Sequence, residues 1–225
     1  MNELISLPSE NGEVIGTGRE GGPLFEYFEF RYAGVNSANG NLLFLNANNE
    51  LTENPNPDTD RVWLNQNLFP DYHGSFGCDF YYTGFFLTAN MSYTFGVYRF
   101  DFVYSGFMDP TNIGTFRHSR DITRAWTPDN TNTDIPSLTA SNIDLDGNRW
   151  IADASYARLR FLTVGYNLPS NILDKVGIRS ARVFLNGENL VTFTEWRGFD
   201  AEQPSNTGRR YPTPRTYSFG FEIGL

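Results

Sequence analysis

Two short clusters of polar residues in the middle of the chain contain side chains that could carry chemistry. His118, Ser119 and Asp121 are the residue types of a hydrolytic triad, and residues 144–148, Asp-Leu-Asp-Gly-Asn, resemble the start of a calcium-binding loop. No nucleophile-elbow glycine pattern accompanies the first cluster. A calcium loop of the EF-hand type needs a glutamate at its twelfth position, where this chain has Ser155. We therefore expect no catalytic residue and no enzyme activity, and we interpret 144–148 as a turn, with calcium binding left open.

The remaining metal-binding residue types are sparse. His73 and His118 are far apart in sequence, and Cys78 is the single cysteine, so neither an internal disulfide nor a cysteine-based zinc cluster is possible within the chain. The formal net charge is -9, whereas a nucleic-acid partner requires a basic face. The sequence thus predicts no metal site, no cofactor and no nucleic-acid binding.

The elements that must position the polar residues are long, two-faced strands. Residues 72–82, YHGSFGCDFYY, and residues 85–97, FFLTANMSYTFGV, alternate apolar with small or polar residues and flank a tight turn at Thr83-Gly84. Strands in soluble proteins are usually ~5–6 residues long. These are about twice that length, which fits the ~9–11 residues of a tilted membrane strand.

Further strands are expected along the chain, with loops between them. Residues 24–35 pair with 41–46 across the turn at 37–40, and 98–107 extend the second strand of the hairpin. The other expected strands are 156–168, 181–193 and 215–225, and short helical turns are expected at 119–126 and 170–180. Residues 1–23 are expected to be irregular, and residues 47–71, 108–154 and 194–213 are expected to be loops. Short connections then alternate with long ones, which places the long loops at one end of the strands.

One face of these strands is strongly apolar. The residues that we expect to face lipid are Phe85, Leu87, Met91, Phe95, Phe219, Phe221 and Ile223. Glu222 alternates away from them, as it must, because a charge on a lipid-exposed face costs a few kcal/mol. Leu162, Val164, Tyr166 and Leu168 share one face of their strand. Arg158 and Arg160 also share a face, and they could point into a polar lumen, reach lipid headgroups or simply be solvated.

Several segments together resemble the SusC/RagA family of TonB-linked outer-membrane transporters. Residues 153–169 match its "S-x-x-R-L-x-x-x-x-L-G-Y-x-L-P" strand, residues 186–194 its "G-x-N-L-x-T-F-T" strand, and residues 211–220 its "Y-P-x-P-R-x-Y-x-x-G" approach to the last strand. Gly198-Phe-Asp200 resembles "G-x-D-P-E", with Ala201 in place of proline and Glu202 retained. The segments at 124–128, 135–136, 32–35 and 83–85 are also similar, and all occur in the family's order.

The resemblance implies an all-β fold, an antiparallel up-and-down transmembrane β-barrel with long extracellular loops and short periplasmic turns. It covers only the C-terminal portion of such a barrel, which has about 22 strands in the full transporters. Residues 1–225 are therefore expected to be that portion, with the plug domain, the TonB-contacting segment and the N-terminal strands outside this sequence. The implied location is the outer membrane of the cell.

The resemblance also implies a function, namely energised import of oligosaccharides, or of peptides in some branches, with a SusD-like surface lipoprotein and the TonB complex as partners. Aromatic and polar residues of the long loops are then candidates for substrate contact. These candidates are Trp126, Asp129, Arg149, Trp150, Trp196, Arg197 and Asp200. Alternatively, the same aromatic residues pack the loops together or form an interfacial girdle.

A different class of function stays open at this point. The chain could be a soluble β-sandwich or a small surface barrel used for adhesion. A sandwich predicts that Phe85, Leu87, Met91 and Phe95 pack against a second sheet, whereas a membrane barrel predicts that they are exposed on one side of a single curved sheet.

Overall fold

The computed structural model describes residues 4–8, 14–19, 21–202 and 211–224. Most of the regular structure is antiparallel β-sheet with few helices, which confirms the predicted fold class. The chain divides into two compact units. The first unit comprises Met1–Phe69, Val97–Asp153 and Pro204–Arg210, and the second comprises Pro70–Gly96, Ala154–Gln203 and Tyr211–Leu225.

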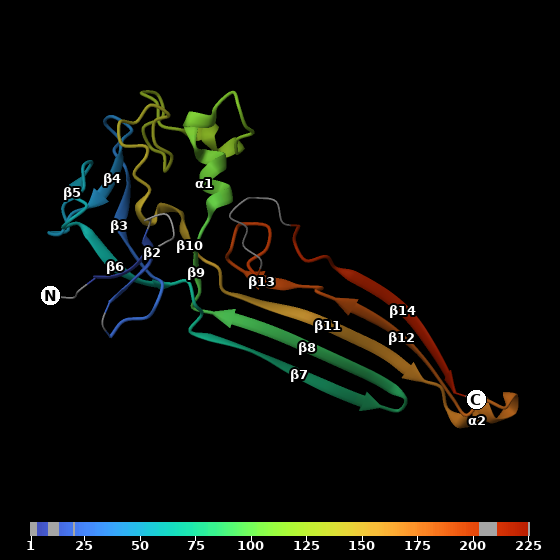
Figure 1. Ribbon diagram of the computed structural model, residues 1–225. Coiled ribbons are helices and arrows are strands. Elements are labelled where there is room, and N and C mark those ends of the chain that lie inside the picture. The colour runs from blue at the N-terminus through green and yellow to red at the C-terminus, as the bar shows by residue number, and fades with distance from the viewer. Residues whose placement is uncertain (1–3, 9–13, 20, 203–210, 225) are drawn as a thin grey trace. The chain divides into compact units, whose positions relative to one another are not determined.

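The second unit is built on one long antiparallel sheet, which Figure 1 shows as a single layer of neighbouring arrows. Its strands are β7 (Tyr72–Tyr82), β8 (Phe85–Phe95), β11 (Tyr156–Asn167), β12 (Ser180–Glu188) and β14 (Thr216–Gly224). They lie in the order β14-β12-β11-β8-β7, and the short strand β13 (Thr192–Thr194) also pairs with β11. The long hairpin and the three later strands are thus confirmed, with 181–193 divided into β12 and β13.

Connections at one end of this sheet are short. Thr83 and Gly84 both have positive φ, 45° and 91°, so a two-residue turn joins β7 to β8 with the twist that a hairpin requires. Between β11 and β12 the chain makes the predicted helical turn, α2 (Ser170–Leu173) followed by the 3-10 turn η4 (Asp174–Val176), and it stops at Gly177 with φ 72°. The long connections, 96–155 and 195–215, leave from the opposite end, where Tyr156 pairs with both Thr94 and Thr194.

The register of the sheet separates an apolar face from a polar face. Rows of directly opposed residues run across all five strands, and successive rows alternate in character. Two apolar rows are Tyr82-Phe85-Tyr166-Val183-Phe221 and Phe80-Leu87-Val164-Leu185-Phe219. The polar row beyond them is Asp79-Thr88-Thr163-Asn186-Ser218. Since side chains of neighbouring rows point to opposite faces, one side of the sheet is apolar over its whole width.

No second sheet covers the apolar face within the described part of this unit. Phe85 is 57% exposed and Phe219 is 69% exposed, and Phe95, Phe221 and Ile223 are exposed as well. Leu87 and Met91, in the interior of the sheet, are half-buried. This arrangement does not fit the sandwich alternative, in which these residues would lie inside a two-layer core.

Between those rows lies a row in which rings cover glycines, Tyr81-Phe86-Gly165-Phe184-Gly220. A Cβ on Gly165 would lie 2.3 Å from the Phe86 ring, and a Cβ on Gly220 would lie 2.4 Å from the Phe184 ring. Phe86 and Phe184 therefore each lie over the bare backbone of the next strand. The ring thus replaces the side-chain packing that a glycine cannot provide.

The first unit contains shorter strands and several helical turns. Its main sheet has the order β5-β4-β3-β6 and consists of β3 (Glu26–Val35), β4 (Leu42–Leu45), β5 (Leu51–Thr52) and β6 (Arg61–Asn67). Two further pairs are β1 (Leu4–Pro8) with β2 (Val14–Arg19), and β9 (Tyr98–Phe100) with β10 (Ile151–Asp153). The helical segments are α1 (Phe102–Met108), η1 (Pro110–Asn112), η2 (Arg120–Arg124) and η3 (Gly147–Trp150).

Three expectations for the first unit were wrong. Residues 1–23 contain the pair β1–β2, and residues 47–71 contain β5 and β6, where only irregular chain was expected. Residues 98–107 do not extend β8, because Gly96 (φ 73°) turns the chain out of the sheet before β9 pairs with β10. Asp101 then starts helix α1, since its side chain accepts a hydrogen bond from Tyr104 N.

Two small apolar clusters hold the first unit together. One contains Met108, Ala125, Ile135 and Trp150, and the other contains Phe30, Leu42 and Phe44. Among the helices of the described residues, none is both long and apolar enough to cross a bilayer.

The glycine row gives a direct test of the second unit's packing. We expect Gly165→Ala to lower the free energy of unfolding by about 1–3 kcal/mol, because the new methyl group overlaps Phe86 and the backbone oxygen of Val183. The additional change Phe86→Leu should restore part of the loss. The measurement is the urea midpoint followed by heat-modifiable gel mobility. Gly106→Ala is the matched control, since nothing lies within 4 Å of its Cβ position. Equal effects of the two alanine variants would contradict this account.

Candidate functional site

A β-bulge in β11 decides where its two arginines point. Opposite β8, Leu159 pairs with Met91 and Phe161 pairs with Asn90, so Arg160 is an extra residue without its own partner. Strict alternation would have put Arg158 and Arg160 on the same face as Leu162, Val164 and Tyr166. The extra residue shifts the alternation by one. The arginines therefore lie on the polar face, and the later apolar residues stay on the apolar face.

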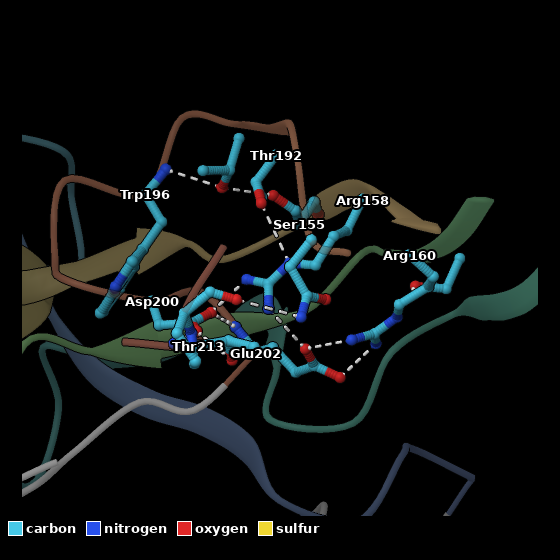
Figure 2. Close-up of polar contacts among 12 residues, drawn as sticks. Ser155, Arg158, Arg160, Thr192, Trp196, Asp200, Glu202 and Thr213 are labelled. Carbon is cyan, nitrogen blue, oxygen red and sulfur yellow. Dashed lines mark hydrogen bonds and ion pairs between the residues drawn. The ribbon is translucent and has the colours of Figure 1, made fainter. Parts of the chain in front are cut away.

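On the polar face, the two arginines bind two carboxylates of the loop that follows β13 (Figure 2). Arg158 donates to Asp200 Oδ1 at 2.5 Å and to Glu202 Oε2 at 2.9 Å. Arg160 donates to both oxygens of Glu202, at 2.9 Å to Oε2. We call Arg158, Arg160, Asp200 and Glu202 the ion cluster. It fixes residues 200–202 against the strand that carries the bulge.

Hydroxyl groups complete the ion cluster. Arg158 Nε donates to Thr192 Oγ1 at 3.0 Å, and Arg160 Nε donates to Ser92 Oγ at 2.7 Å. The far end of the loop is attached too, because Thr213 donates to Asp200 Oδ2 from both its N–H (2.9 Å) and its hydroxyl (2.8 Å). Asp200 thus joins the start and the end of the loop to β11.

The electrostatics of Asp200 follow from these contacts. Burial by itself would raise the pKa of this carboxyl, but the Arg158 guanidinium and the hydrogen bonds from Thr213 and Glu202 N together lower its pKa to about 2. Asp200 is therefore ionised throughout the physiological pH range. A buried, ionised and fully bonded carboxylate is suited to holding the loop in place.

The cluster has a closed half and an open half. The side chains of Arg158 and Asp200 are each 4% exposed, whereas those of Arg160 and Glu202 are 28% and 27% exposed. Solvent therefore reaches the Arg160–Glu202 pair and does not reach the Arg158–Asp200 pair.

The other candidate residues of this loop have different roles in the structure. Trp196 is buried, and its indole lies against Gly198, where a Cβ would lie 2.3 Å from Nε1. The backbone N–H of Trp196 donates to Thr194 Oγ1 at 3.0 Å, and that hydroxyl donates to Ser155 O at 2.7 Å. Arg197, next to it, is exposed. Of the three candidates in this loop, only Arg197 presents its side chain to solvent.

The four candidates in the first unit lie on the 108–154 connection. Trp126 is half-buried, covers Gly40 and donates from Nε1 to Ser37 O at 3.0 Å, and Asp129 is exposed. The Arg149 guanidinium lies 4.2 Å from the centre of the Trp150 ring, and Trp150 itself is buried.

Arg149 and Trp150 line a cavity of about 280 Å³ together with Asp109, Asp144 and Asp146. Burial lowers the pKa of Arg149, and burial raises the pKa of Asp146, whose carboxylate accepts a hydrogen bond from Trp150 Nε1 at 2.8 Å.

The clusters that suggested chemistry in the sequence have structural partners. Ser119 caps η2 by accepting from Asp121 N, and Asp121 accepts from the Tyr104 hydroxyl at 2.9 Å. In the 144–148 turn, Asn148 Oδ1 accepts from Tyr32 N at 2.8 Å. Among the described residues, no three His, Cys, Asp or Glu side chains are grouped so that they could hold a metal ion.

Sequence reasoning did not connect the arginines of β11 with Glu202 and Thr213. One signal was present, because an uninterrupted alternation would have placed two charges on an apolar face. That conflict indicates a bulge somewhere between Arg158 and Leu162. Nothing in the local sequence identifies the carboxylates that the arginines meet about forty residues later.

Comparisons with known proteins agree with this geometry. No model of a known protein family matches the chain. Among curated proteins, the chain is similar to three TonB-dependent receptors of Formosa agariphila, named P3, P26 and P39. P3 is 37% identical over 123 residues, which are 49% of this chain, and P26 is 29% identical over 127 residues, which are 50% of it. P39 is 26% identical over 200 residues, which are 82% of this chain. The chain spans 12%, 13% and 19% of these relatives.

Solved structures of the RagAB peptide importer have the same fold. The RagAB peptide importer in its closed-closed state superimposes with a TM-score of 0.80 at 25% identity, over 92% of this chain and 24% of that one. A second structure, of the RagAB peptide transporter, gives a TM-score of 0.80 at 24% identity over 98% of this chain and 24% of the other.

The open sheet with one apolar face and the matches to solved importers define a segment of an outer-membrane β-barrel. These similarities support a SusC/RagA-like fragment of a TonB-dependent transporter, and the relatives that the chain matches are receptors and importers.

A double-mutant cycle tests the buried half of the ion cluster. In the full-length receptor, we expect Arg158→Met to lower the free energy of unfolding by about 3–5 kcal/mol, because Asp200 is left buried without its counter-ion. Adding Asp200→Asn should recover part of that loss. Urea unfolding in detergent measures both.

The control is Arg182→Met. Arg182 pairs with Glu222 on the same polar face, but the two side chains are 48% and 61% exposed, so the expected loss is below about 1 kcal/mol. Additive effects of the two changes at positions 158 and 200, or equal losses for Arg158→Met and Arg182→Met, would refute the buried anchor.

Proposed function

We propose that residues 1–225 form the C-terminal portion of the β-barrel of a TonB-dependent active transporter, which imports oligosaccharides or peptides across the outer membrane together with a SusD-like lipoprotein. The observation that carries this proposal is the alternation of apolar and polar rows across five strands of 9 to 12 residues. Such strands are long enough to cross the hydrocarbon core of a bilayer when tilted.

Hydrocarbon is the environment that suits the apolar face. The sheet leaves that face uncovered over its whole width, and in water an apolar surface of this extent would drive association. We assign the lipid contact to the seven residues expected from the sequence, Phe85, Leu87, Met91, Phe95, Phe219, Phe221 and Ile223. The polar face, which carries the ion cluster, then lines the interior of the barrel.

Substrate contact is assigned to the accessible members of the loop candidates. Trp126, Asp129, Arg149 and Arg197 are exposed or half-buried and so can meet a ligand. The buried candidates, Trp150, Trp196 and Asp200, hold the loops that carry them. Aromatic faces next to charged groups suit the recognition of sugars and of peptides alike.

The partners follow from the related proteins. The similar solved structures are described as a RagAB peptide importer, and the curated relatives are named TonB-dependent receptors. We therefore propose a SusD-like lipoprotein at the outer surface and energy input from the TonB complex through a part of the receptor outside these 225 residues.

The lipid-facing assignment is tested by a charge placed on either face of one strand. Met91 and Asn90 are neighbours near the middle of β8 and point to opposite faces. In the full-length receptor folded into lipid vesicles, Met91→Arg should cost about 2–4 kcal/mol of folding free energy, and Asn90→Arg should cost less than ~1 kcal/mol. Urea titration of the folded fraction measures both. Similar costs at the two positions would rule out a lipid boundary on the apolar face.

Uptake measurements test the transport function. Cells that express the full-length receptor with its lipoprotein should accumulate labelled oligosaccharides or peptides, and disabling TonB should abolish that uptake because plug movement needs energy. The two labelled substrate classes are compared in the same cells. Uptake that persists without TonB, or accumulation of neither substrate class, would contradict the proposal.

A further inference from the structure

The two arginines of the ion cluster differ in whether their carboxylate partner can be replaced. Arg158 has two carboxylate partners, and the pair that it forms with Asp200 is closed to solvent. Among the described residues, Arg160 forms an ion pair with Glu202 alone, and this pair is the open half of the cluster. Loss of Glu202 would thus leave Arg158 still neutralised by Asp200 and would leave Arg160 without a counter-ion.

Arg160 is also held in a geometry that is ready to bind a carboxylate. Its two terminal nitrogens donate to the two oxygens of Glu202, and its Nε donates to Ser92 Oγ at 2.7 Å. Ser92 belongs to β8, so a neighbouring strand fixes the plane of the guanidinium. A planar, fixed fork of donors is the arrangement that recognises carboxylates in a bidentate manner.

We propose that Arg160 is a recognition site for a carboxylate group of the transported ligand, and that Glu202 occupies this site when no ligand is bound. This inference rests on the proposed import function and adds an acidic ligand class to it. A ligand carboxylate replaces the Glu202 carboxylate group for group, so the number of hydrogen bonds to Arg160 is conserved. The Arg160–Glu202 pair is partly exposed and a ligand carboxylate offers the same two acceptor oxygens, so the exchange is close to balanced.

The charges of the cluster favour an acidic ligand over a neutral one. Two guanidinium groups face two carboxylates, and removal of Glu202 from Arg160 leaves one positive charge on the polar face. A neutral ligand at that position leaves the guanidinium unpaired in a partly buried place, which is unfavourable. The Arg158–Asp200 pair stays in place during the exchange, so the loop remains attached while Glu202 moves.

The carboxylate can come from a uronic acid or from the C-terminus of a peptide, and the experiment separates these sources. Four probes are used with the purified full-length receptor: trigalacturonate, its methyl ester, a hexapeptide with a free C-terminal carboxylate, and the same hexapeptide as the amide. Binding is measured by titration calorimetry. If the free sugar acid binds more tightly than its ester, the ligand carboxylate comes from a uronic acid. If the free peptide binds more tightly than its amide, the carboxylate comes from a peptide C-terminus.

Variants of both partners then locate the site. We expect Glu202→Ala and Glu202→Gln to bind the acid probe at least about threefold more tightly than the unmodified receptor, because the internal competitor is lost. Arg160→Met should weaken the acid probe about tenfold or more and leave the neutral probe unchanged. Arg182→Met removes a guanidinium from the Arg–Glu pair at the other end of the same face, and should change neither.

Each result decides the proposal. No preference for the acid over its neutral form in Glu202→Ala, or the same loss of binding in Arg160→Met and Arg182→Met, overturns the carboxylate site. Heat-modifiable mobility confirms folding, and Glu202→Gln keeps the side-chain volume if Glu202→Ala does not fold. TonB-dependent uptake of neutral substrates together with no acid preference refutes this inference and leaves the proposed function in place. Absence of any TonB-dependent uptake refutes the proposed function.

Discussion

The structure of the second unit depends on keeping charge away from one face of a sheet. A guanidinium on that face would have no partner and, in a bilayer, no water, at a cost of a few kcal/mol. β11 contains two arginines and three apolar residues at alternating positions, from Arg158 to Tyr166, which a regular strand would have placed together. The bulge at Arg160 shifts the alternation by one residue, so the arginines lie on the polar face and the apolar residues lie on the other face of the same strand.

The same bulge determines how the following loop is held. Because the arginines lie on the polar face, they need counter-charges there, and Asp200 and Glu202 supply them from a loop far away in sequence. The buried Arg158–Asp200 pair fixes the position of the loop more than it adds net stability, since a buried ion pair must offset a large desolvation cost. The pair attaches the loop at one defined place and Thr213 attaches its end. A loop that we propose to carry substrate-contacting residues needs a defined position more than it needs additional stability.

Local patterns predicted the parts of the fold in which local sequence is decisive. The hairpin of β7 and β8 has its turn at Thr83-Gly84 because these residues adopt positive φ, and both long strands alternate clearly on either side. The strand β6 was not predicted, because RVWLNQN lacks alternation and Asn65 has φ 54°; pairing with β3 alone makes it a strand. Helix α1 was not predicted either, since its residues, FVYSGFM, are typical of a strand, and the cap at Asp101 and packing in a tertiary cluster decide. Of the ion cluster, only Asp200 was among the candidates for substrate contact, because its closest contacts join residues about 40 positions apart.

In the ion cluster, solvent exposure and not residue type distinguishes the arginine that supports the loop from the arginine that we propose to bind a ligand. Arg158 and Arg160 are identical side chains two positions apart, and both bind Glu202. Arg158 is enclosed with Asp200, so that ion pair is fixed for as long as the sheet is folded. Arg160 and its partner Glu202 are reached by solvent, so this ion pair can be replaced without unfolding the rest of the sheet. A strand that keeps one arginine closed and the next one open can hold a loop and still offer a charged group to a ligand that enters along the polar face.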